Sequence, residues 1–372
     1  MRLFIALLSV LVVNLSNAQN KEVYLLVGSN TTDGISVYKF NTVLGTSTFV
    51  SKLSDAENTT YMAFSRDHKY IYGVNEYSGN KTGDVSAYSF DKTKGELHFL
   101  NKTTTAGIGP CYVDIDSTGK WVVVANYGGG NLSMIPVGTD GSLQPLVQTI
   151  QHQGYGANAT RQNGPHAHCA TFSSDGKYVF SNDLGTDVVY QYKFTPSSQQ
   201  PLSETDTALM QVPDGFGPRH ITFHPNGKFA YLINELSGKV IAYQYNSSNG
   251  RLTELQTIES TNIGEKQDKG SADIHITPNG QYLYTTNRGS ANDITIYRVG
   301  STGLLTVLGH QSCGGIHPRN FTIDPTGKFL LVANRDSNNI VVYTIIKSTG
   351  MLEAAGQPIQ VTKPMFVRMI EK

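Results

Sequence analysis

The amino-acid sequence repeats one motif. An apolar stretch is followed by a turn that usually ends in Gly-Lys, then by a second apolar stretch and an Asn or Asp. Copies cover residues 62–75, 113–126, 170–183, 221–234, 274–287 and 321–334. Two apolar stretches joined by an Asn-Gly, Asp-Gly or Thr-Gly turn are typical of a β-hairpin. A hairpin that recurs about every 50 residues predicts a repeat architecture, in which neighbouring units bury each other's apolar faces.

A second hairpin follows each motif and is centred on one residue of an alternating apolar sequence. The central residues are Tyr38, Tyr88, Tyr192, Tyr243, Tyr297 and Tyr343, with Ile135 in the same place once. This makes seven outer hairpins and six inner ones, and the chain ends supply the missing strands at 23–27 and 365–370. The pattern predicts an all-β fold, a seven-bladed β-propeller with four antiparallel strands per blade. We expect the N- and C-terminal strands to close the ring within one blade, since a solenoid would carry polar capping repeats.

The first residues stand apart from these repeats. Arg2 precedes an apolar run from Leu3 to Val13, and the small-residue sequence Ser16-Asn17-Ala18 follows. This arrangement is typical of a secretory signal peptide at residues 1–18. We therefore expect residues 19–372 to form a single propeller domain that is periplasmic or secreted. The apolar run is too short to span a membrane.

Charge and cysteine content exclude several classes of partner. The 29 Lys and Arg residues balance the 29 Asp and Glu residues. The protein therefore has no net charge that would attract it to nucleic acid or to a membrane surface. Three cysteines, Cys111, Cys169 and Cys313, are too few for a disulfide scaffold. The core must therefore be hydrophobic. A closed ring needs no partner to cover its edges, so we expect a monomer.

Two positions vary among the repeats, although the motif around them is kept. Eight residues before the turn glycine, the copies carry Thr60, Cys111, His168, Arg219, Ala272 and Arg319. Eight residues after it, they carry Glu76, Tyr127, Leu184, Glu235, Arg288 and Arg335. Both positions lie at the end of the hairpin opposite the turn, where the inner strands of a propeller converge on the axis. A requirement of the fold would recur in every blade, so this uneven set of charges predicts a ligand site at one mouth of the channel.

The predicted site combines histidine, arginine and glutamate. The catalytic candidates are His168, Glu235, Arg219 and Arg288, and the substrate-binding candidates are His166, Arg319, Arg335, Glu76 and Asn126. Arginine keeps its charge and binds carboxylate or phosphate oxygens with two parallel hydrogen bonds. Either His168 or Glu235 could act as a general base toward water. The surplus of arginine predicts a small anionic ligand.

The closely spaced His166 and His168 have other uses. They could bind a metal, with Asp183 or Glu235 as further ligands. The surrounding arginines would repel a divalent cation, so we expect neither a metal nor an organic cofactor. The two histidines could also be structural residues bonded to backbone groups, or they could carry protons. Cys111 shares the axial position, and we interpret it as a small buried residue rather than a nucleophile.

Several short sequences resemble those of the seven-bladed lactonase family. They are Gly164-Pro-His-Ala-His168, Val124 to Gly130, Asn182 to Asp187, Gly217-Pro-Arg-His220 and Asn234-Glu235. This family contains bacterial 6-phosphogluconolactonases of the propeller type and fungal 3-carboxy-cis,cis-muconate cyclases. In the cyclases a His, two Arg and a Glu at the channel mouth form the proposed active site. The matching positions are His168, Arg219, Glu235 and Arg288, whereas Tyr112 stands where family members often have His.

The resemblance implies a lactone hydrolase that opens an anionic sugar-acid lactone by metal-free general-base catalysis, in the manner of 6-phosphogluconolactonase. Two alternatives remain open. One is a carboxymuconate-type cycloisomerase, a lactonizing enzyme that would use the same residues. The other is a non-catalytic propeller that binds an anionic glycan or a protein partner. Export disagrees with a phosphorylated cytosolic substrate, so an unphosphorylated aldono- or uronolactone is an equal expectation.

Overall fold

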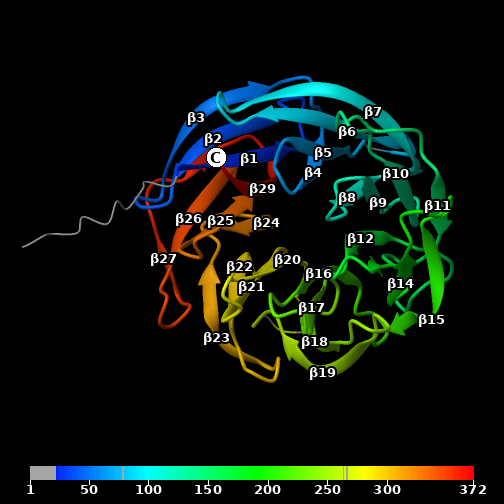
Figure 1. Cartoon of the computed structure of the whole chain (residues 1–372). Coiled ribbons are helices and arrows are strands. Elements are labelled where there is room, and N and C mark those ends of the chain that lie inside the picture. Colours follow the sequence, from blue (N-terminus) through cyan, green and yellow to red (C-terminus); the bar gives the residue numbers. More distant parts are fainter. Residues whose placement is uncertain (1–21, 78, 263, 265–266) are drawn as a thin grey trace, which may run out of the picture.

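Seven antiparallel β-sheets are arranged as blades around a central axis (Figure 1). The computed structural model describes residues 22–77, 79–262, 264 and 267–372. These residues form strands and turns, and no helix among them is long and apolar enough to cross a membrane. The expected signal peptide at residues 1–18 lies outside the described residues. The predicted all-β, seven-bladed propeller is confirmed.

The two ends of the described chain meet in blade 1, where the strand order is β29-β1-β2-β3. Its strands are β1 (Glu22–Ser29), β2 (Ile35–Asn41), β3 (Thr46–Leu53) and β29 (Pro364–Glu371). Leu25 lies opposite Met369, and Val27 lies opposite Val367. An antiparallel hydrogen-bond ladder therefore joins the first and last strands, and the predicted closure of the ring is confirmed.

The other blades follow in chain order. Blade 2 contains β4 (Thr59–Phe64), β5 (Tyr70–Asn75), β6 (Thr82–Asp91) and β7 (Glu96–Ile108), and blade 3 contains β8 (Pro110–Ile115), β9 (Trp121–Asn126), β10 (Asn131–Pro136) and β11 (Gln148–Gln151). Blade 4 contains β12 (Ala167–Phe172), β13 (Tyr178–Asp183), β14 (Val188–Phe194) and β15 (Leu202–Gln211), and blade 5 contains β16 (Pro218–Phe223), β17 (Phe229–Asn234), β18 (Lys239–Tyr245) and β19 (Leu252–Glu259). Blade 6 contains β20 (Ser271–Ile276), β21 (Tyr282–Asn287), β22 (Asp293–Val299) and β23 (Leu305–Ser312). Blade 7 contains β24 (Pro318–Ile323), β25 (Phe329–Asn334), β26 (Asn339–Ile345), β27 (Leu352–Ala354) and β28 (Ile359–Gln360).

The outer half of each blade agrees with the predicted second hairpin. The residues expected at its centre lie on the third strands: Tyr38, Tyr88, Ile135, Tyr192, Tyr243, Tyr297 and Tyr343. The outermost strands are the least regular. β11 has only four residues, and the outer edge of blade 7 is divided between β27 and β28, which both pair with β26.

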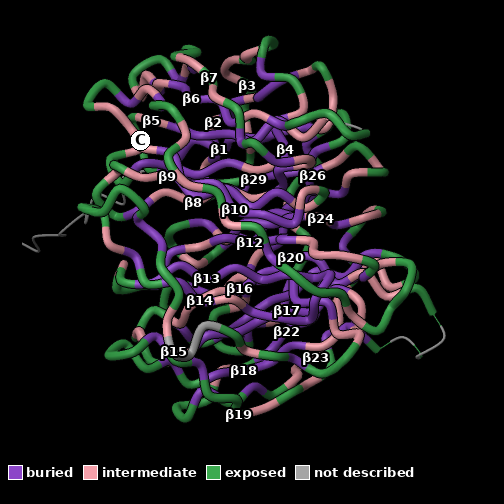
Figure 2. The backbone as a smooth tube through the Cα atoms, turned by 90° about the vertical axis from the view of Figure 1, so that its right-hand side faces the viewer, coloured by how far each residue is buried: buried purple, intermediate pink, exposed green. Residues whose placement is uncertain are grey.

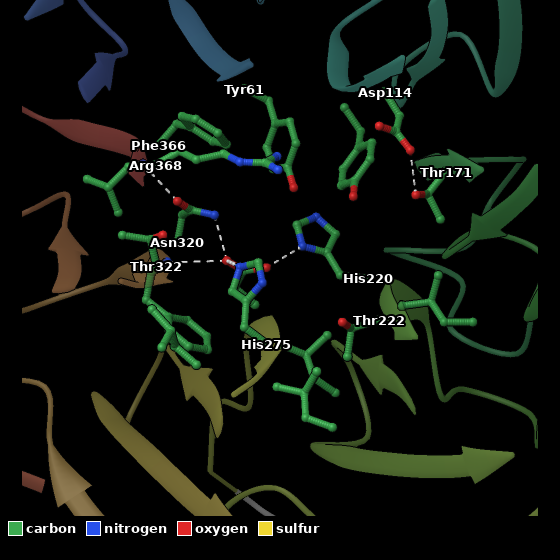
Figure 3. A pocket seen from close by; sticks show the side chains of 18 of the residues that line it. Tyr61, Asp114, Thr171, His220, Thr222, His275, Asn320, Thr322, Phe366 and Arg368 are labelled. Carbon is green, nitrogen blue, oxygen red and sulfur yellow. Dashed lines mark hydrogen bonds and ion pairs between the residues drawn. The ribbon is translucent and has the colours of Figure 1, made fainter. Parts of the chain in front are cut away.

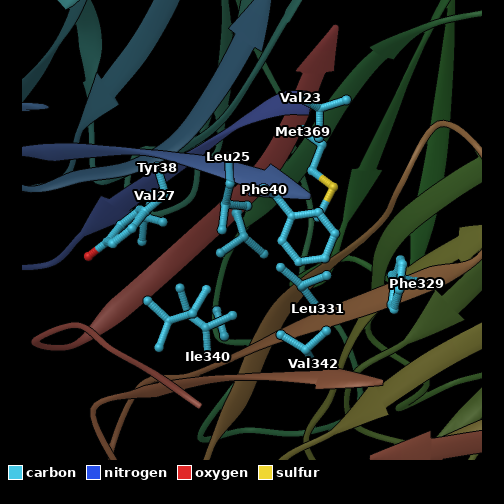
Figure 4. Close-up of a cluster of buried hydrophobic side chains, with 13 residues drawn as sticks. Val23, Leu25, Val27, Tyr38, Phe40, Phe329, Leu331, Ile340, Val342 and Met369 are labelled. Atoms are coloured by element: carbon cyan, nitrogen blue, oxygen red, sulfur yellow. The ribbon is translucent and has the colours of Figure 1, made fainter. Parts of the chain in front are cut away.

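The hydrophobic core consists of seven clusters, each packed between two neighbouring blades. Figure 4 shows the cluster between blades 7 and 1, where Leu25, Phe40 and Met369 meet Leu331 and Val342. Buried residues fill the interior of the ring, and exposed residues gather in the turns and the outer strands (Figure 2). A single blade cannot cover its own two faces, so contact between blades holds the ring together.

A β-bulge lies at the start of the innermost strand in all seven blades. In blade 5, Pro218 lies opposite Asn234 and His220 lies opposite Ile233, so Arg219 has no partner across the pair. The residues left unpaired at the same place in the other blades include Thr60, Cys111, His168, Ala272 and Arg319. A bulge interrupts the alternation of side chains and re-aims the extra residue. Here the extra residue and the residue that follows it both face the channel, as Arg219 and His220 do.

Leu25→Ala should lower the free energy of unfolding by about 2–5 kcal/mol, because the truncation leaves a cavity at a fully buried position between blades 1 and 7. Leu44→Ala is the matched control. Leu44 is 67% exposed, and its truncation should change the free energy by less than about 0.5 kcal/mol. Urea denaturation followed by circular dichroism measures both changes. Equal effects of the two substitutions would contradict the placement of the core between the blades.

Candidate active site

The bulge residues and the ends of the second strands meet at one end of the channel, which we call the upper mouth. His168 and Arg219 lie near the starts of β12 and β16, and Glu235 and Arg288 directly follow β17 and β21. These four residues come from three blades. Their side chains nevertheless make one cluster, as the comparison of the repeats predicts.

Glu235 is the centre of this cluster. Its Oε2 accepts from Arg219 Nε at 3.0 Å and lies 2.8 Å from Arg288 Nη2, while Oε1 accepts from Arg161 Nη2 at 2.7 Å. Burial alone would raise the pKa of Glu235. The guanidinium groups of Arg288, Arg219 and Arg161, together with His168, hold the pKa of this carboxyl well below its usual range. Glu235 is therefore ionised although only 5% of its surface is exposed.

His168 faces the same carboxylate from the neighbouring blade. Its Nε2 lies 3.7 Å from Glu235 Oε2, and its Nδ1 lies 3.7 Å from Cys111 Sγ. Burial, and then the charge of Arg219, lower the pKa of His168 well below its ordinary value. The imidazole is therefore neutral near pH 7 and has a nitrogen lone pair with which to accept a proton.

Arg219 and Arg288 are anchored by the strand start of blade 6. Arg219 is 1% exposed and donates to the carbonyl oxygen of Ala272, and burial followed by the charge of Arg288 lowers its pKa to about 10. Arg288 donates through Nε to the carbonyl oxygen of Gly270 at 2.9 Å. Each guanidinium group therefore uses Nε and one Nη nitrogen within the protein. Both residues are suited to positioning Glu235 more than to gripping a ligand.

Arg161 completes the cluster, and comparison of the repeats did not predict it. It lies on the long connection between β11 and β12, which has no counterpart in the other blades. Its Nη2 donates to Tyr127 Oη at 3.2 Å as well as to Glu235, and its side chain is 41% exposed. The only sequence feature that points to Arg161 is its position shortly before the Gly164-Pro-His-Ala-His168 sequence.

The predicted substrate-binding residues lie in different environments. Arg319 Nη2 is 3.8 Å from Glu76 Oε2, beyond hydrogen-bond range, with its side chain 16% exposed. Arg335 forms a two-point ion pair with Asp336, at 2.6 and 3.0 Å.

His166 is held in place beside the cluster. Its ring stacks on Tyr127 at a centroid distance of 4.5 Å, and its Nδ1 lies 3.0 Å from the Tyr127 carbonyl oxygen. His166 and Arg319 thus lie beside the cluster with polar atoms still open to a ligand, whereas Arg335 is occupied by its neighbour.

Asn126, another predicted substrate-binding residue, lies inside its own blade. It is completely buried, and its Nδ2 donates to the Asn131 carbonyl oxygen and to Ser133 Oγ within its own blade. The recurrent Asn therefore ties the second strand to the third, and its Oδ1 is buried without a hydrogen-bond partner. Asp183, weighed above as a metal ligand, is also occupied. Its Oδ2 lies 2.6 Å from His152 Nδ1, and its Oδ1 accepts from the His166 backbone N–H at 2.7 Å.

Cys111 does not have the properties of a nucleophile. Its thiol is buried, and burial raises its pKa to about 12, so the thiolate is not formed near neutral pH. Its contact with His168 Nδ1 makes it a packing partner of the imidazole. Within the described residues no group of three or more His, Cys, Asp or Glu side chains is arranged to hold a metal ion.

Known proteins share the sequence pattern and the fold of this chain. Residues 24–369 match the profile of the family described as "Lactonase, 7-bladed beta-propeller". The chain is 37% identical over 294 residues to the 6-phosphogluconolactonase of Formosa agariphila, which covers 78% of this chain and 82% of that protein. It is 36% identical over 268 residues to the 6-phosphogluconolactonase of Bacillus subtilis, which covers 72% of this chain and 74% of that protein.

The similarity extends to solved structures. The periplasmic gluconolactonase of Pseudomonas aeruginosa superposes with a TM-score of 0.89 at 32% identity, over 94% of this chain and 99% of that one. The match to the family profile, residues 24–369, includes the blades that hold Glu235 and His168 and most of the strands that close the ring. The chain therefore belongs to the seven-bladed β-propeller lactonase family.

Proposed function

We propose that this protein hydrolyses a sugar-acid lactone at the upper mouth. The observation that carries the proposal is the neutral imidazole of His168, 3.7 Å from the ionised carboxylate of Glu235 inside a cluster of guanidinium groups. Ester hydrolysis needs a base for the attacking water and positive charge for the developing oxyanion. Relatives named 6-phosphogluconolactonase and gluconolactonase support the same class of reaction.

His168 is the proposed general base. Its Nε2 accepts a proton from water as the water oxygen attacks the carbonyl carbon of the lactone. Glu235 is less suited to this role, because both of its carboxylate oxygens already contact the guanidinium groups of Arg161, Arg219 and Arg288. Its negative charge instead orients the imidazole and balances the positive charge that His168 acquires.

Arg161 and Arg319 are the guanidinium groups proposed to contact the substrate. Both keep exposed surface at the mouth, whereas Arg219 and Arg288 are fixed by Glu235 and by backbone carbonyls. Their N–H groups would stabilise the oxyanion of the tetrahedral intermediate. When the intermediate collapses, the ring C–O bond breaks and the leaving alkoxide takes the proton from His168. The product is a hydroxy acid.

The proposed substrate is an aldono- or uronolactone, with or without a phosphate group. Every such lactone yields a carboxylate, so the arginines at the mouth do not require a phosphate. We also propose that the protein is exported, which the sequence pattern of residues 1–18 supports. The periplasmic gluconolactonase among the structural relatives supports export as well. Export favours an unphosphorylated lactone.

The proposal is tested by following acid release at constant pH from a panel of δ- and γ-lactones of sugar acids. We expect release above the spontaneous rate for at least one of them. Acid release separates hydrolysis from a cycloisomerase reaction, which closes a lactone ring and consumes no water. A panel in which no lactone opens faster with the protein than in buffer would contradict the proposal.

His168→Gln should lower kcat/KM about 10²–10⁴-fold, because it removes the general base while keeping a polar side chain of similar reach. His98→Gln is the matched control, since His98 is exposed on the outer strand β7. The control should have unchanged kinetics. Thermal melting of both variants separates loss of the base from loss of the fold. Wild-type kcat/KM in folded His168→Gln would exclude His168 as the base.

The pH profile offers an independent test. Because the pKa of His168 lies well below its ordinary value, the imidazole stays neutral and kcat/KM should remain level as the pH falls from about 8 to about 6. Protonation removes the base, so the decline belongs at lower pH. Initial rates corrected for spontaneous hydrolysis give the profile. A decline centred near pH 6.5, the ordinary value for histidine, would count against this assignment.

A further inference from the structure

A second cavity lies in the channel beyond the upper mouth (Figure 3). We call this cavity, of about 420 Å³, the lower pocket. Side chains of the innermost strands line it, nearer the turn ends of those strands than the bulges are. Arg368 on β29 lies at its edge and is exposed to solvent. The volume is that of a typical small-molecule site.

Two rings of side chains line the lower pocket. The floor is formed by residues that follow the bulge positions, among them Tyr61, Tyr112, His220, Asp273, Asn320 and Phe366. The wall is formed two residues further along, by Asp114, Thr171, Thr222, His275, Thr322 and Arg368. Side chains two apart on a strand face the same side, so both rings face the channel. The wall residues differ from blade to blade, which a lining required only by the fold would not do.

The floor separates the lower pocket from the upper mouth. Tyr61 stacks on Tyr112 at a centroid distance of 4.2 Å and meets the edge of Phe366 at 4.7 Å. Tyr61, His220 and Asn320 also line a small void above the floor, with a volume of about 10 Å³. Such a void has room for about one water molecule. The two ends of the channel are therefore separate compartments for any larger ligand.

Some polar groups of the lower pocket serve the fold. The carboxylate of Asp273 accepts from Asn320 Nδ2 at 2.5 Å and lies 2.8 Å from His220 Nδ1 and 2.9 Å from His275 Nε2. Asp114 accepts from Thr171 Oγ1 at 2.7 Å. Apart from the His275 contact, which lies within β20, these bonds join innermost strands of neighbouring blades, where no backbone ladder runs. Their bonding capacity is largely used.

Other groups keep free hydrogen-bonding capacity. Within the described part of the chain, the hydroxyls of Thr222 and Thr322 have no hydrogen-bond partner, and Arg368 forms no ion pair. His275 uses Nε2 for Asp273, which leaves its Nδ1 to the pocket. Figure 3 shows these side chains around one open space. The fold does not need them, so they are available to a ligand.

We propose that the lower pocket binds a small neutral polyhydroxylated molecule, such as a monosaccharide or a cyclitol. Sugar hydroxyls both donate and accept, which matches Thr222, Thr322 and His275, and the rings of the floor offer an apolar surface to the C–H face of a sugar. The carboxylates of Asp114 and Asp273 disfavour an anion, and Arg368 disfavours a cation. This site goes beyond the proposed hydrolysis and does not depend on it.

Calorimetric titration with D-glucose, D-xylose and myo-inositol tests the proposal. We expect at least one of them to bind the wild-type protein and Glu235→Gln equally well, because Glu235 lies in the other compartment. The double variant Thr222→Val, Thr322→Val keeps the side-chain volumes and removes both free hydroxyls. It should bind the same ligand about tenfold more weakly, as expected for two lost hydrogen bonds.

Thermal melting confirms that each variant is folded, and a crystal soaked with the bound ligand should show density beside Thr222 and Thr322. Gluconate, the anionic counterpart of glucose, should not displace the ligand. Failure of all three ligands to bind would overturn the proposal. So would unchanged affinity in the double variant, loss of affinity in Glu235→Gln, or displacement by gluconate. None of these readouts uses lactone turnover, so they are independent of the proposed reaction.

Discussion

The position of the site follows from the β-bulge at the start of the innermost strands. In a regular strand, side chains alternate between the two faces of the sheet, and in this ring both faces pack against neighbouring blades. The bulge adds one residue that lies outside the pairing of the first two strands. His168, Arg219 and Arg319 occupy this place. They can therefore differ from blade to blade without disturbing the core between the blades.

Charges placed there are buried, and they must compensate one another. An isolated carboxylate or guanidinium group in such a position would be strongly destabilising. Pairing of Glu235 with Arg219 and Arg288 offsets that cost. The same burial and positive charge lower the pKa of His168, which leaves a neutral imidazole beside an ionised carboxylate. One cluster thus meets the electrostatic requirement of the fold and has the properties that the proposed hydrolysis needs.

Comparison of the repeats predicted the seven blades, the closure of the ring and the gathering of His168, Glu235, Arg219 and Arg288. Each of these features follows from positions that recur along the chain. Arg161 could not be found in this way, because its loop has no counterpart in other blades and a lone sequence does not tell how a long loop folds. For Asn126, recurrence places the residue near the mouth without showing which way its side chain turns.

The two variable positions at the mouth do not reveal the lower pocket, because its floor and wall lie further along the same strands. Each innermost strand contributes residues to this lining, from Tyr61 in blade 2 to Arg368 in blade 1. Many of these residues are polar, and they differ from blade to blade. The residues that line the lower pocket can be read from the sequence once the register of the innermost strands is known. The bulge sets that register.

The central claim is that the upper mouth is the reacting end of the channel. A crystal structure of the protein with a bound sugar-acid product, such as gluconate, tests it most directly. The carboxylate of the acid is predicted to lie at the upper mouth, within hydrogen-bond distance of the Arg161 guanidinium and next to His168 Nε2. Density for the acid in the lower pocket alone, with only solvent at the upper mouth, would contradict the claim.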